Sequence, residues 1–141
     1  NNLFYIDTKS DLLIERKDYA KAITMLEAQR KMKPTSQVIN ANLANIYIEA
    51  DQAPKAIPLL EDMIFLDKQN ELPYQLLTTV YKKTGNQALE YFSTAELMAL
   101  GANYKGAIDQ LNFAYRASEN NPLQLARIEA RIRQFKMADK E

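Results

Sequence analysis

One segment of the chain recurs at a spacing of 34 residues. Residues 18–26 (DYAKAITML) return as residues 52–60 (QAPKAIPLL) and again as residues 103–111 (NYKGAIDQL). The step from Ala22 to Ala56 is 34 residues, and the step from Ala56 to Ala107 is 51, one period and a half. A repeat of this length is typical of stacked helix–turn–helix units, and the half period adds one helix.

The apolar residues inside each unit follow helical spacing. Leu43, Ala44 and Tyr47 share one helix face, and the same spacing returns 34 residues later. No stretch alternates like a strand, so we predict an all-α fold that forms a single domain over residues 1–141, a fragment of a longer chain. The eight predicted helices span residues 3–16, 19–32, 36–50, 53–66, 70–83, 86–100, 104–118 and 122–137.

Capping and breaking residues separate these helices. Thr35 and Ser36 offer N-cap oxygens, and Asn121 precedes a proline suited to a first helical turn. Gly85 is expected to end its helix in a left-handed conformation. Pro58 lies inside a predicted helix, where it should remove one backbone hydrogen bond and bend the helix.

These motifs resemble the tetratricopeptide repeat over nearly the whole chain. The pattern Leu-Ala-x-x-Tyr followed by x-Lys-Ala-Ile is most complete in residues 37–70. The resemblance implies a right-handed superhelical array of antiparallel helix pairs. Asn40 departs from the family, which usually has a large aromatic residue there, and Lys9 replaces an apolar residue.

Composition excludes several classes of function. The chain has no cysteine and no histidine, which removes thiolate nucleophiles and the commonest general base and metal ligand, so we expect neither an enzyme nor a cofactor. The 18 basic and 18 acidic residues balance, which argues against nucleic acid as a partner. No window is apolar enough for a transmembrane segment.

The C-terminal part carries a narrower resemblance. Residues 93–111 (STAELMALGANYKGAIDQL) and 124–132 (QLARIEARI) are similar to the closing block of the periplasmic beta-barrel assembly-enhancing zinc metalloproteases of Gram-negative bacteria. The resemblance implies a periplasmic, non-catalytic module that contacts outer-membrane assembly machinery and a preceding protease domain. A cytoplasmic location stays open, as does a free-standing adaptor that binds a peptide or protein in its concave groove.

The predicted partner-binding surface is the concave face, formed by the first helix of each pair. Its residues lie opposite the Leu-Ala-Tyr stripe and were assigned by helical spacing and the 34-residue period. The candidate residues are Asp7, Asp11, Glu15, Asn42, Asn45, Ile48, Glu49, Gln75, Thr79, Lys82 and Lys83.

This face changes charge along the array. The acidic first helix and the basic pair Lys82 and Lys83 would orient an extended peptide of opposite polarity. The alternative is a solvated helix face whose charges carry no information, as most surface charges do. The positions that clamp a carboxylate in chaperone-tail-binding repeats hold no cations here, so we expect no such clamp.

Overall fold

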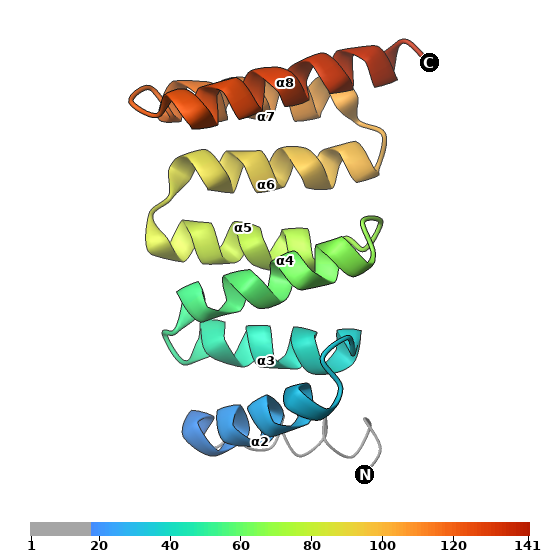
Figure 1. Ribbon diagram of the computed structural model, residues 1–141. Coiled ribbons are helices and arrows are strands. Elements are labelled where there is room, and N and C mark those ends of the chain that lie inside the picture. The colour runs from blue at the N-terminus through green and yellow to red at the C-terminus, as the bar shows by residue number, and fades with distance from the viewer. Residues whose placement is uncertain (1–17) are drawn as a thin grey trace. The chain divides into compact units, whose positions relative to one another are not determined.

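The computed structural model describes residues 18–141, and these residues contain seven α-helices and no strand. Each helix predicted after residue 18 is present with ends shifted by two residues or fewer, except that the start of the fourth is a 3-10 turn. Figure 1 labels these helices α2 to α8. The prediction of a helix over residues 3–16 lies outside the described residues. The elements are α2 (Tyr19–Met32), α3 (Gln37–Glu49), η1 (Ala53–Lys55), α4 (Ala56–Leu66), α5 (Leu72–Thr84), α6 (Gln87–Leu100), α7 (Tyr104–Ala117) and α8 (Pro122–Asp139).

Side-chain caps begin most of these helices, as the sequence predicts. The Ser36 hydroxyl accepts a hydrogen bond from the Ile39 N–H at 3.2 Å, and the Asn121 side chain accepts one from the Gln124 N–H at 3.1 Å. Each bond satisfies a backbone donor that has no partner within its helix. Gly85 ends α5 with φ of 75°, which confirms the expected left-handed conformation.

Two further turns use residues that the sequence does not single out. Asp51 and Ala102 have φ of 60° and 61°, although neither is glycine. In the second turn the neighbouring Gly101 has φ of −89°, so the left-handed position falls one residue later than the glycine. Such conformations cost an L-residue some free energy, which the surrounding helices must offset.

The prediction that Pro58 removes a backbone hydrogen bond from its helix is wrong, whereas the bend stays a prediction. The α-helix α4 begins at Ala56, because the preceding residues form the 3-10 turn η1. Pro58 therefore lies in the first turn of α4, where backbone N–H groups have no intrahelical carbonyl to meet. Its missing N–H removes no hydrogen bond from this α-helix.

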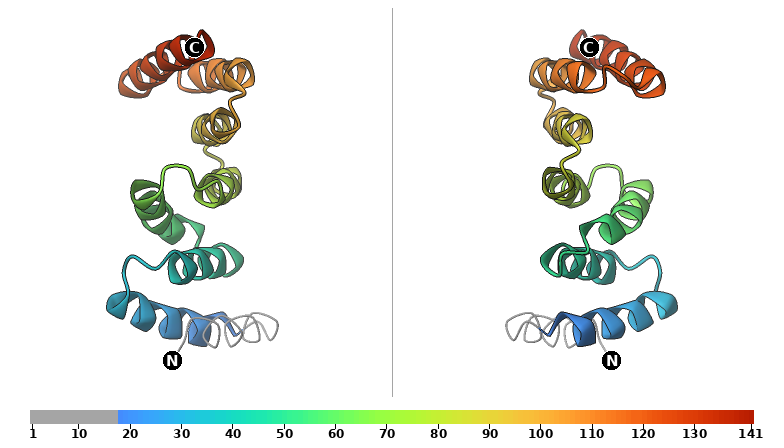
Figure 2. Two further views of the ribbon diagram at one scale, coloured as in Figure 1. Left: turned by 90° about the vertical axis from the view of Figure 1, so that its right-hand side faces the viewer. Right: turned by 90° about the vertical axis from the view of Figure 1, so that its left-hand side faces the viewer.

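The chain divides into two compact units, residues 1–76 and residues 77–141, with the boundary inside α5. In the described part of the first unit, α3 packs against both α2 and α4, as the views along the helices also show (Figure 2). The buried side chains of this unit include the repeated Ala and Leu positions: Ala22, Leu26, Leu43, Ala44, Ala56 and Leu60. The expectation of a single domain over residues 1–141 remains a prediction.

In the second unit, α7 packs against both α6 and α8. Its core joins small residues that allow close approach of the helices to a few large ones that fill the remaining space. The buried members are Phe92, Ala95, Ala107, Leu111, Ala114, Ile128 and Phe135. Tyr104 packs on Phe135 with ring centroids 5.8 Å apart.

Candidate functional site

Three of the four residues that the sequence assigns to a partner-binding face on α3 are at least partly exposed, and the fourth is buried. Asn45 and Glu49 are exposed and Asn42 is half-buried, in agreement with a stripe turned away from the Leu43 and Tyr47 side. Ile48, however, is only 3% exposed. Because α3 packs between α2 and α4, its buried arc covers more of its circumference than the repeat pattern implies, and Ile48 falls within that arc.

The remaining candidate residues lie on other elements. Gln75, Thr79, Lys82 and Lys83 are exposed on α5, and the last three belong to the second unit. Lys82 also forms a long ion pair with Glu90, at 4.0 Å. Asp7, Asp11 and Glu15 lie outside the described residues, so the predicted change of charge along the face stays a prediction.

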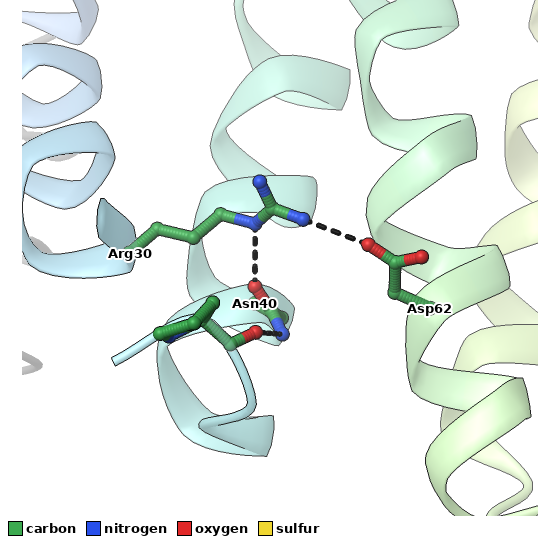
Figure 3. Close-up of polar contacts among 4 residues, drawn as sticks. Arg30, Asn40 and Asp62 are labelled. Carbon is green, nitrogen blue, oxygen red and sulfur yellow. Dashed lines mark hydrogen bonds and ion pairs between the residues drawn. The ribbon is translucent and has the colours of Figure 1, made fainter. Parts of the chain in front are cut away.

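The opposite side of α3 carries a polar cluster that links three helices (Figure 3). Asn40 on α3 is fully buried; its Oδ1 accepts a hydrogen bond from the Arg30 Nε at 2.9 Å. Its Nδ2 donates to the Pro34 carbonyl at 3.1 Å.

Arg30 extends this cluster from α2 to α4, where its Nη2 donates to Asp62 at 2.8 Å. The buried amide is therefore satisfied through both its oxygen and its nitrogen, as burial requires. The sequence marks Asn40 as a departure from the repeat, which usually has an aromatic residue at this position. In the structure a buried, hydrogen-bonded amide takes its place.

Tyr47 occupies the same side of α3 one turn beyond Leu43. Its hydroxyl donates a short hydrogen bond to Glu27 on α2. Burial, and then the hydrogen bond and the negative charge of Glu27, raise the pKa of Tyr47 to about 12, although Arg30 opposes the rise. The hydroxyl therefore stays a hydrogen-bond donor at every physiological pH.

These groups border a hollow of about 540 Å³ within the first unit. Its walls come from the end of α2, from α3, and from η1 with the start of α4. The lining residues are Glu27, Arg30, Lys31, Pro34, Leu43, Tyr47, Lys55, Pro58 and Leu59. The sequence offers no signal for this hollow, because its residues come from three helices and none belongs to the predicted face.

In the second unit, the block that resembles a protease family is used for packing between helices. The Arg131 Nε on α8 donates to both carboxylate oxygens of Glu96 on α6, at 2.9 and 3.1 Å. The guanidinium of Arg131 also lies 4.3 Å from the Phe135 ring centroid. The ion pair joins α8 to α6, and the contact with Phe135, which lies on α8 itself, holds the guanidinium in position.

The helix α6, which the half period adds, buries one of its two adjacent aromatic residues. Phe92 is 9% exposed, and the guanidinium of Arg127 covers its ring at 4.7 Å. Tyr91 is half-buried and packs against Phe113, with ring centroids 5.4 Å apart.

Within residues 18–141, no three carboxylate side chains gather closely enough to hold a metal ion. No helix in this part of the chain has the length and apolar character needed to cross a membrane.

Comparison with known proteins identifies the repeat. Residues 13–80 match the tetratricopeptide repeat family. The chain is 30% identical over 135 residues to the beta-barrel assembly-enhancing protease of Escherichia coli (strain K12) and 28% identical over 135 residues to that of Yersinia pestis. It is 36% identical over 136 residues to the putative beta-barrel assembly-enhancing protease of Vibrio cholerae serotype O1.

Each of these alignments includes 96% of the present chain, which spans 28% of the length of the curated relatives it matches. Both resemblances drawn from the sequence, to the repeat and to the protease family, are thereby confirmed. The chain contains a tetratricopeptide-repeat domain and is homologous over nearly its whole length to the C-terminal part of the beta-barrel assembly-enhancing protease.

Proposed function

We propose that this chain is the non-catalytic, partner-binding part of a periplasmic zinc metalloprotease or chaperone that acts in the quality control of outer-membrane protein assembly. The observation that carries the proposal is the alignment of 96% of the chain with a restricted part of proteins named for that assembly. A chain without histidine or cysteine suits binding rather than hydrolysis. The zinc ligands of such an enzyme would lie in a separate protease domain.

Two binding surfaces are proposed, each taken by itself: the exposed side of α3 in the first unit, and the exposed residues of α5. Asn42, Asn45 and Glu49 offer amide and carboxylate groups to a protein or an extended peptide. On α5, Gln75, Thr79, Lys82 and Lys83 offer amide, hydroxyl and ammonium groups. Repeat arrays bind their partners through such helix faces, and the partners proposed here are outer-membrane assembly proteins and the protease domain of the same chain.

Site-specific photo-crosslinking tests this proposal. A benzophenone amino acid at Asn45, Glu49 or Thr79 of the full-length protein should capture outer-membrane assembly proteins in cells. Lys68, exposed in the turn after α4, is the matched control position and should give little product. Equal capture at Lys68 would rule out the residues of α3 and α5 as the binding residues.

The coding sequence upstream of Asn1 tests the other half of the proposal. A secretion signal followed by a His-Glu-x-x-His motif is expected there, since that motif supplies two zinc ligands and a general base. An unrelated domain, or a start codon within a few residues, would instead leave a free-standing repeat adaptor.

A further inference from the structure

The hollow in the first unit combines a positively charged rim with apolar walls. Lys31 and Lys55 are exposed at its edge, on α2 and η1. The rings of Pro34 and Pro58 are also exposed. Leu43, which is nearly fully buried, also lines the hollow.

The charges that line the hollow do not cancel. Three cations and one carboxylate border it, which leaves a net charge of +2. Arg30 is already engaged by Asp62 and Asn40, and Glu27 accepts the hydrogen bond from Tyr47.

Two lysines account for the excess of positive charge. In residues 18–141, neither Lys31 nor Lys55 takes part in an ion pair. The Lys55 ammonium lies 5.9 Å from the Tyr47 ring centroid, a cation–π contact that leaves its charge available to an anion.

We propose that this hollow binds an acidic segment of an extended polypeptide, whose carboxylates meet Lys31 and Lys55 while an apolar neighbour packs on Pro34 and Pro58. The inference rests on the proposed role as a protein-binding module but assigns a second surface. The α3 residues of the predicted face, Asn45 and Glu49, do not line the hollow. A volume of about 540 Å³ accommodates a few side chains of such a segment.

The arrangement favours a polypeptide over an anionic membrane. A bilayer surface is approached by protruding apolar side chains and clustered cations. Here the apolar groups line a concave surface between α2 and α4, so a narrow chain can reach them more readily than a bilayer can.

Fluorescence anisotropy with a defined probe tests the site. The probe is a fluorescein-labelled decapeptide of alternating glutamate and leucine, and its lysine-for-glutamate counterpart is the specificity control. The double variant Lys31→Glu/Lys55→Glu should lower the affinity of the 141-residue chain for the acidic probe about tenfold at low salt, because two attractions become repulsions. The double variant Lys31→Ala/Lys55→Ala should show a smaller loss in the same direction.

The matched control is Lys68→Glu/Lys105→Glu, which changes the net charge equally at two exposed lysines that do not line the hollow. Its affinity should stay within about twofold of the parent chain, and circular dichroism should show both reversal variants folded. Equal losses in the two reversal variants, or binding of the lysine probe, would overturn the site. So would lysine-dependent binding to phosphatidylglycerol vesicles without binding of the acidic peptide.

This experiment and the crosslinking fail separately. Crosslinks from α3, with no change in probe affinity when Lys31 and Lys55 are replaced, would rule out the hollow as a binding site and leave the proposed function intact. Peptide binding at the hollow without crosslinks from α3 or α5 would do the reverse.

Discussion

In both units of the chain an ion pair joins two helices that are not adjacent, but the residues around the pair differ. In each, an arginine reaches a carboxylate on a helix two places along the array: Arg30 on α2 pairs with Asp62 on α4, and Arg131 on α8 with Glu96 on α6. The partners are 32 and 35 residues apart, close to one repeat. A repeat fold therefore gains contacts that skip a helix wherever one long side chain finds an acceptor.

The surroundings of the two links differ. The Arg30 link runs past the buried Asn40 amide of the intervening helix, and Asp62 itself is 58% exposed. The Arg131 link lies against the Phe135 ring, and Glu96 is only 15% exposed. The first link thus depends on a buried hydrogen-bonded amide and the second on a shielded carboxylate, and each difference can be tested.

The largest effect is expected at Asn40. Asn40→Ala leaves a cavity in the core, and it also leaves the Pro34 carbonyl and the Arg30 Nε without their hydrogen-bond partner. The variant should therefore lower the free energy of unfolding by about 3 kcal/mol. Urea denaturation measures the loss, and hydrogen exchange should place it in the first unit. The exposed neighbour Asn45→Ala is the control and should change stability by less than about 0.5 kcal/mol. A loss at Asn40 no larger than this would show that the amide is dispensable.

A smaller loss of unfolding free energy should distinguish the carboxylate of Glu96 from that of Asp62. Glu96→Gln should cost about 2 kcal/mol of unfolding free energy, because a shielded carboxylate that accepts two bonds from Arg131 is lost. Asp62→Asn should cost less than about 1 kcal/mol, and added salt should reduce that cost further, because Asp62 is largely solvated. Denaturation of both variants at low and high salt gives the comparison. Equal costs with equal salt dependence would mean that burial does not distinguish the links.

The smallest effect is a change in the pKa of one tyrosine in each unit. Hydrogen bonding to Glu129 is the main cause that raises the pKa of Tyr115, whereas burial is the main cause that raises the pKa of Tyr47 to about 12. Glu129→Gln should therefore return the pKa of Tyr115 close to its ordinary value, and Glu27→Gln should lower that of Tyr47 only in part. Phenolate absorbance, referenced to Tyr115→Phe and Tyr47→Phe, measures both.

The Tyr47 shift also predicts how stability changes with pH. Because its pKa in the folded chain exceeds the unfolded value of 10.0, its contribution is complete below pH 10.0 and is lost as the pH rises toward about 12. Tyr47→Phe should remove this part of the alkaline loss. An unchanged alkaline profile in that variant would assign the loss to other groups.

The sequence predicts the helices well because their signals are local. The caps at Ser36 and Asn121 and the stop at Gly85 depend on residues a few positions away. The place of Pro58 differs from the prediction because a 3-10 turn precedes α4, and the repeat pattern carries no signal for that turn.

The site was harder to predict because burial depends on neighbouring helices. Ile48 has the spacing of an exposed residue but is buried where α3 packs between two neighbours. Asn40 stands out in the sequence, yet the partners that explain it come from α2 and α4. The hollow needs the same three-dimensional arrangement, so no spacing rule would have revealed it.

The helix-skipping arginine links have a consequence for cooperativity. An array whose helices touch only their immediate neighbours can fray from an end, one helix at a time. With Arg30 joined to Asp62 and Arg131 to Glu96, loss of a terminal helix also removes a bond to the helix two places away. The links therefore favour joint opening of three consecutive helices, more strongly in the second unit, where Glu96 is shielded, than in the first, where Asp62 is solvated.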